Sequence, residues 1–155
     1  MNSLKDAISE FVSSPRNIFY VLVSPQHEVY GRDIVKNAIS SIGLIQEDVD
    51  LFSISLTAYE EACKYLSGYK DISYIQQHIS RKFKSLIKEK LEKIDPRNDI
   101  VYVYNVSSAK ASYVSESELI GSIISFNFKT VILLPQETEY ASFLGYGTVF
   151  RLHRE

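Results

Sequence analysis

The stretch "VLVSPQHEVYGRDIVKNAI", residues 21–39, decides the fold. It begins as an apolar, β-branched segment typical of a buried strand, passes through a proline-containing turn, and continues with apolar residues at helical spacing. A strand, a short turn and a helix form the opening unit of α/β proteins with parallel sheets. In many nucleotide-binding proteins of that class, the turn after the first strand is the phosphate loop.

The turn lacks the residues of a working phosphate loop. That loop follows the pattern GxxxxGK[ST], in which backbone N–H groups and a lysine hold the phosphates and a hydroxyl holds magnesium. Aligned on Gly31, the first glycine position holds Gln26, the lysine position Arg32 and the hydroxyl position Asp33. Gln26 adopts the backbone range of glycine only at a cost, and Asp33 places a carboxylate where phosphate should sit. The sequence therefore predicts a degenerate loop without a nucleotide cofactor.

Outward from this stretch, strands and helices alternate along the chain. Strands are expected at residues 17–24, 49–56, 99–107, 129–135 and 147–153. Helices are expected at residues 4–12, 31–42, 58–66, 71–94 and 116–126, with Gly43 ending the second and Thr57 capping the third through Glu60. We expect one α/β domain over residues 1–155, with a mostly parallel sheet of about five strands flanked by helices in three layers. The plan is P-loop-like or Rossmann-like without a working phosphate loop.

The expected core consists of apolar residues from four of these strands. They are Phe19, Val21, Val23, Leu51, Ile54, Val101, Val103, Val131 and Leu133.

Composition favours a globular cytoplasmic protein. The chain has 155 residues, 45% of them hydrophobic, a net charge of -2 and a single cysteine, Cys63. We expect no signal peptide at the N-terminus and no membrane span. The histidines His27, His78 and His153 are scattered, so no metal site is assigned, and no catalytic residue is assigned either.

Two polar segments should meet at the carboxyl ends of the strands. The first supplies Ser24, His27, Glu28 and Arg32, and the second, within residues 107–118, supplies Ser107, Ser108, Lys110 and Tyr113. One interpretation is a rim pocket for a nucleotide or another small ligand. The other is a pair of solvated loops, with Ser115 capping the next helix.

Two further features suit contacts with other macromolecules. The helix at residues 79–94 carries a local charge of +4, leaving -6 for the remainder, and its candidate basic surface comprises Arg81, Lys82, Lys84 and Lys88. Such a surface is a solvated face, a contact for an acidic protein, or a contact for nucleic-acid phosphates. Four tyrosines suit a protein interface if exposed: Tyr30, Tyr113, Tyr140 and Tyr146.

The order of elements resembles the BrxB family of the BREX phage-defence systems. The resemblance covers most of the chain and rests on the opening helix and on "VSPQHEVYGRDIVKNAI", "VDLFSISLTAYEEACKYL", "IVYVYNVSS", "VILLPQETEY" and "FLGYGTVFRLH". It implies a small α/β protein, related to the P-loop fold without its ATP chemistry, that works beside an ATPase, a methyltransferase and a phosphatase-like protein. "SSAKASYV" stands where that family has a glycine-containing loop, so no site residue is carried over.

Three functional hypotheses follow. The first is a non-catalytic interaction subunit whose partners are other protein subunits with acidic surfaces. The second is a nucleic-acid-binding accessory protein that uses the helix at residues 79–94. The third is a nucleotide or small-ligand sensor at the rim.

Overall fold

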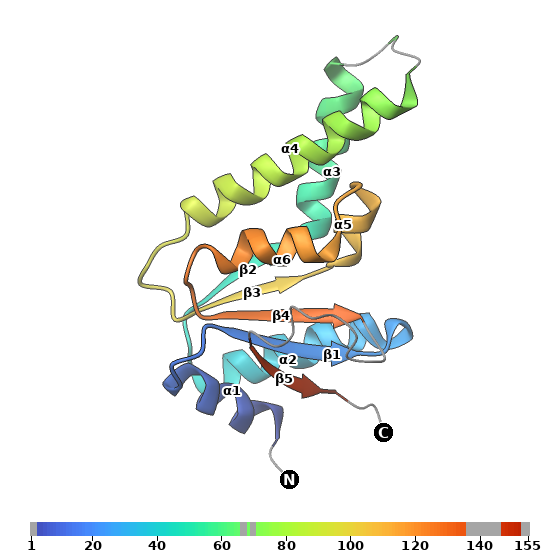
Figure 1. Cartoon of the computed structure of the whole chain (residues 1–155). Coiled ribbons are helices and arrows are strands. Elements are labelled where there is room, and N and C mark those ends of the chain that lie inside the picture. Colours follow the sequence, from blue (N-terminus) through green and yellow to red (C-terminus); the bar gives the residue numbers. More distant parts are fainter. Residues whose placement is uncertain (1–2, 66–67, 69–70, 136–146, 153–155) are drawn as a thin grey trace.

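The chain forms a three-layer α/β fold around a five-stranded parallel sheet (Figure 1). The computed structural model describes residues 3–65, 68, 71–135 and 147–152. The elements are α1 Leu4–Ser13, β1 Ile18–Val23, the 3₁₀ turn η1 Pro25–His27, α2 Glu28–Ile42, β2 Gln46–Asp50, α3 Leu51–Tyr65, α4 Ile72–Glu92, β3 Ile100–Tyr104, α5 Ser107–Ala111, α6 Glu116–Ile124, β4 Thr130–Pro135 and β5 Thr148–Arg151. The strand order is β2-β3-β4-β1-β5, and the pairings are parallel. The fold class expected from the sequence is confirmed.

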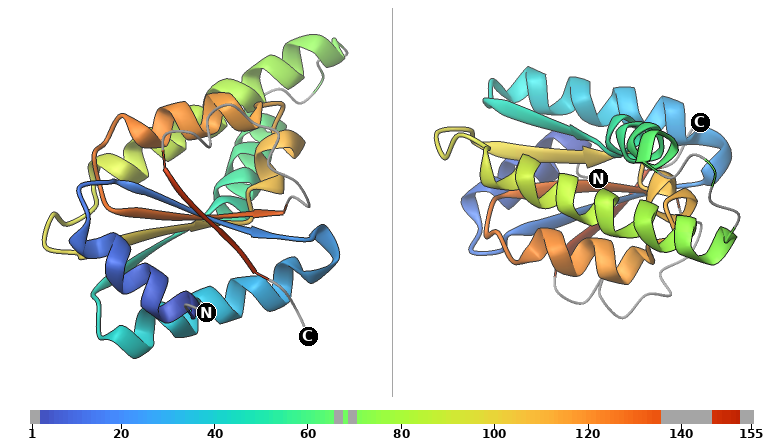
Figure 2. Two further views of the ribbon diagram at one scale, coloured as in Figure 1. Left: turned by 60° about the horizontal axis from the view of Figure 1, so that its bottom comes forward. Right: turned by 90° about the horizontal axis from the view of Figure 1, so that it is seen from above.

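The helices divide between the two faces of the sheet (Figure 2). Helices α1 and α2 cover one face, and α3 to α6 cover the other. Strand β1 is buried on both sides: Phe19, Val21 and Val23 face α1 and α2, whereas the alternate residues face the second layer of helices. This double burial explains why the strand reads as a continuous apolar run.

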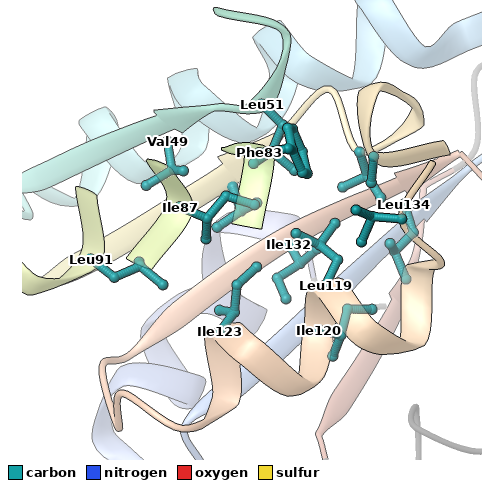
Figure 3. Close-up of a cluster of buried hydrophobic side chains, with 14 of the residues drawn as sticks. Val49, Leu51, Phe83, Ile87, Leu91, Leu119, Ile120, Ile123, Ile132 and Leu134 are labelled. Atoms are coloured by element: carbon teal, nitrogen blue, oxygen red, sulfur yellow. The ribbon is translucent and has the colours of Figure 1, made fainter. Parts of the chain in front are cut away.

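The larger of two core clusters lies between the sheet and helices α3 to α6 (Figure 3). Phe83, Ile87 and Leu91 of α4 project onto it from one side, and Leu119 and Ile123 of α6 from another. Every residue of the expected core belongs to one of the two clusters, although Ile54 is only partly buried. Leu51 and Ile54 reach the core from a helix rather than from a strand.

The expected second strand at residues 49–56 is wrong. Strand β2 ends at Asp50, and α3 starts at Leu51. The Asp50 carboxylate starts the helix, because it accepts hydrogen bonds from the Phe52 N–H (3.0 Å) and from the Ser53 hydroxyl (3.0 Å). Thr57 is therefore not a cap: it lies within α3 and donates its hydroxyl hydrogen to the Ser53 carbonyl.

Other boundaries also differ from the sequence prediction, and β3 ends at Tyr104 rather than at residue 107. Helix α2 begins at Glu28 rather than at Gly31, and the polar segment after β3 contains the short helix α5. The predicted caps Gly43 and Ser115 are confirmed: Gly43 ends α2 with a φ of 80°, and Ser115 accepts from the Glu118 N–H. Asp71, where a helix was expected to start, caps α4 by accepting from the Tyr74 N–H.

Lys129, just before β4, links the C-terminal end of α1 to the sheet. Its ammonium donates to the carbonyls of Phe11 (3.3 Å), Ser14 (2.5 Å) and Arg16, and lies 4.8 Å from the centre of the Phe11 ring. These carbonyls are at or just beyond the C-terminal end of α1, where a cation is favoured.

Candidate functional site

The turn after β1 is shorter and more closed than a phosphate loop. Only Ser24 to His27 separate β1 from α2. The His27 N–H donates to the Ser24 carbonyl (2.8 Å), and the Ser24 hydroxyl pairs with Nδ1 of His27 (3.1 Å). A phosphate loop instead leaves several backbone N–H groups pointing into an open concavity. The geometry thus agrees with the degenerate turn inferred from Gln26, Arg32 and Asp33.

Gly31 serves packing rather than phosphate binding. It is buried inside α2, and a Cβ added to it would lie 3.1 Å from Cγ2 of Val23 on β1. The glycine thus lets the helix approach the strand closely.

A chain of hydrogen bonds links α2 to the ends of β2 and β3 at the carboxyl edge of the sheet. Nη1 of Arg32 donates to Oδ1 of Asn105 (3.0 Å), and Nδ2 of Asn105 donates to Oδ1 of Asp50 (2.7 Å). Asn105 directly follows β3 in the left-handed region, with a φ of 61°, which asparagine tolerates better than most residues. The Tyr102 hydroxyl donates to the Arg32 carbonyl (2.9 Å), and burial raises the pKa of that phenol far above its ordinary value. Arg32 is therefore held in place by structural contacts.

Glu28 is the least satisfied polar group of this edge. Its Oε1 atom is buried and accepts no hydrogen bond from the described part of the chain. Burial raises the pKa of the Glu28 carboxyl, and the positive charge of Arg32 offsets this only in part. Strand order reverses between β1 and β4, and ligands of open α/β sheets bind at such a reversal. A polar group near this point that accepts no hydrogen bond is therefore a functional candidate.

The structure assembles only half of the expected rim pocket. Ser24, His27, Glu28 and Arg32 lie together at the start of α2. The other half lies on α5 and just beyond it. This segment packs against α3: Ser112 pairs its hydroxyl with that of Ser55 (2.7 Å), and Tyr59 of α3 donates to the Ala111 carbonyl. Ser108 is buried, and Ser107 and Lys110 are exposed. Tyr113 turns toward α3 and α4, where it lies close to Tyr59 and borders a hollow beside α4.

Carboxylates accompany most of the candidate basic surface. Lys82 pairs with Glu61 of α3 (2.8 Å), Lys84 with Glu118 of α6 (2.7 Å), and Lys88 more loosely with Glu92 (4.0 Å). Arg81 donates to the neutral amide of Gln77 at 3.4 Å. Lys82 faces α3, and the other three cations lie along a different side of α4.

Sequence reasoning missed an apolar stripe on the outer side of α3. Phe52 and Leu56 are 57% and 49% exposed, and Tyr59 and the exposed Cys63 continue the line at helical spacing. Tyr113, which is 48% exposed, lies close to Tyr59 and widens the stripe. We call Phe52, Leu56, Tyr59, Cys63 and Tyr113 the α3 stripe.

Other exposed apolar residues lie where α3 ends and α4 begins. Tyr65 is 66% exposed and Ile72 is 69% exposed. Figure 1 shows these two helix ends projecting beyond the rest of their layer. Of the four tyrosines expected at an interface, Tyr113 is exposed and Tyr30 is partly buried, whereas Tyr140 and Tyr146 lie outside the described residues, as does His153.

The described ranges contain no group of three His, Cys, Asp or Glu side chains arranged to hold a metal ion. Within the same ranges, no helix has the length and apolar character required to cross a membrane. Comparisons with protein-family models, with curated proteins and with solved structures found no match.

Proposed function

We propose that this chain is a non-catalytic interaction subunit that docks a protein partner on the α3 stripe. The observation that carries the proposal is the exposure of Phe52 and Leu56 side by side on one helix. A helix packed on a sheet normally turns polar residues to solvent, and α3 exposes Phe52 and Leu56 beside its polar residues. Contiguous exposed apolar surface that includes aromatic residues is typical of protein interfaces.

The carboxyl edge of the sheet supports a non-catalytic role. The turn at residues 24–27 closes on itself, and the Arg32 side chain is bonded to Asn105. A guanidinium that stabilises phosphate charge must turn its donors toward the ligand, and here at least one is committed to the fold. The chain thus keeps the plan of a nucleotide-binding fold while its polar residues join strands together.

A protein partner is favoured over nucleic acid. The chain outside residues 79–94 carries -6. This negative charge would repel a polyanion that approached over a broad surface. Because the sequence resembles BrxB, we expect the partner among the other proteins of a BREX-type defence complex.

Affinity purification from the native host tests this proposal. The chain is tagged and compared with the double variant Phe52→Gln/Leu56→Gln, in which glutamine preserves helix propensity while it removes the apolar surface. The matched control is Ile45→Gln, because Ile45 is 57% exposed and lies outside the stripe. We expect a stoichiometric partner with the wild type and the control, and its loss with the double variant. Full retention by a double variant of unchanged thermal stability would refute docking on the stripe.

A further inference from the structure

A groove follows one side of α4. At its lower end, a hollow of about 400 Å³ lies between α4 and α6, with Lys84 and Lys88 on its wall and Ile87 and Phe126 among its lining. Toward the start of α4, a second hollow of about 430 Å³ is bordered by Gln77, Ser80, Arg81 and Tyr113. Figure 2 shows α4 running along the outside of its layer with α5 and α6 beside it. We call the two hollows together the α4 groove.

Three cations line the α4 groove at the spacing of a helix face. Arg81, Lys84 and Lys88 follow one another at intervals of three and four residues, so they point to the same side. They span about 10 Å along the helix axis at the usual rise per residue. A second helix laid alongside α4 presents carboxylates at the same spacing, and can therefore match the cations one to one.

These cations are available to a partner. Lys84 and Glu118 are each about half exposed, and the Lys88–Glu92 pair spans 4.0 Å. Exposed pairs of this kind contribute little, so a partner carboxylate can share or replace the present one. Arg81 is joined to a neutral amide only by a long contact of 3.4 Å.

The remainder of the α4 groove is not built to hold phosphate. The hydroxyls of Ser122 and Ser125 already donate to backbone carbonyls at 2.9 and 2.8 Å, so their hydrogens are committed within α6. The partly buried Phe126 at the edge of the hollow suits contact with an apolar side chain rather than with a phosphate.

We propose that the α4 groove binds an acidic amphipathic helix of a partner protein. Carboxylates of that helix pair with Arg81, Lys84 and Lys88, and an apolar side chain rests on the partly buried Phe126. This inference rests on the proposed function and identifies the chemistry of the partner segment. Tyr113 belongs both to the α4 groove and to the α3 stripe, so one partner can cover the two surfaces together.

An amide NMR titration tests the α4 groove with the full chain. The probe is a synthetic helical peptide with glutamates on one face and leucines beside them. We expect amide shifts confined to residues around 77–88, 113 and 122–126. The triple variant Arg81→Gln/Lys84→Gln/Lys88→Gln should bind about tenfold more weakly or worse, which corresponds to the loss of a few exposed charge contacts.

Matched controls separate specific binding from general attraction. The variant Lys90→Gln/Lys93→Gln changes charge on the same helix outside the α4 groove and should bind the peptide nearly as well as wild type. A peptide of the same composition with scrambled order should bind more weakly. Absence of shifts up to about 1 mM peptide, shifts on another surface, or tighter binding of single-stranded oligo(dT) at the same salt would overturn the proposal. None of these outcomes bears on docking at the α3 stripe. That proposal is tested separately, by whether the native partner is lost when Phe52 and Leu56 are replaced.

Discussion

Truncation of Val103 to alanine tests the position of β3 inside the sheet. Val103 is fully buried and belongs to the larger core cluster, and β3 lies between β2 and β4. The substitution removes two methyl-sized groups, each worth about 0.8 kcal/mol in transfer free energy. The cavity left among packed side chains adds to this loss, so we expect the free energy of unfolding to fall by about 2–3 kcal/mol.

Urea denaturation measures that change against a matched control. Val29→Ala removes the same atoms from a side chain that is 63% exposed on α2, and should change the free energy of unfolding by less than about 0.5 kcal/mol. The slope of unfolding free energy with urea should stay the same in both variants, because the fold is unchanged. A cost for Val103→Ala as small as that of the control would refute the central placement of β3.

Three further outcomes follow from the described contacts. Because burial raises the Glu28 pKa, the native state disfavours the charged carboxylate: stability present below the ordinary glutamate pKa is lost as pH rises through the raised value. Glu28→Gln should therefore lose less stability than wild type between pH 4 and pH 7. Thermal midpoints that change with pH by the same amount in both proteins would contradict this reasoning. Lys129→Met should lower the free energy of unfolding by about 1–3 kcal/mol, since three carbonyls near the end of α1 lose their cation; an unchanged urea midpoint would show that this contact is dispensable. Isothermal calorimetry with ATP and magnesium should give no micromolar binding, because the turn at residues 24–27 is closed by its own hydrogen bonds; micromolar affinity would overturn the degenerate-loop interpretation.

The fold was largely predictable because the burial of the central strands determines which residue types they contain. A strand covered on both faces is apolar at nearly every position, and residues 18–23 and 131–134 satisfy that condition. Helix caps such as Asp71 and Ser115 were recognisable because a short polar side chain meets a free backbone N–H at a fixed offset.

The beginning of α3 was misread for a physical reason that also bears on function. Phe52, Ile54 and Leu56 alternate with serines, which is the pattern of a half-buried strand. In the structure the alternation spans a helix, so Phe52 and Leu56 turn outward while Leu51 and Ser55 are buried. An arrangement of apolar residues that does not match the secondary structure is expected where the surface serves function, such as binding a partner, rather than folding.

The candidate rim pocket shows the limit of reasoning from strand ends alone. Parallel strands do bring Arg32 and Asn105 together, but the direction of a side chain after a short helix depends on packing. Tyr113 has a φ of 61° and its hydroxyl meets Tyr59, which the order of residues does not indicate.

Hydroxyl-radical footprinting of the chain, free and in its native complex, tests the interaction most directly. Oxidation reports the solvent access of individual Phe, Leu and Tyr side chains, and the stripe contains all three types. We expect Phe52, Leu56 and Tyr113 to be oxidised in the free chain and protected in the complex, while Val29 and Ile45 react equally in both. Equal oxidation of Phe52 and Leu56 with and without the partner would contradict docking on the α3 stripe.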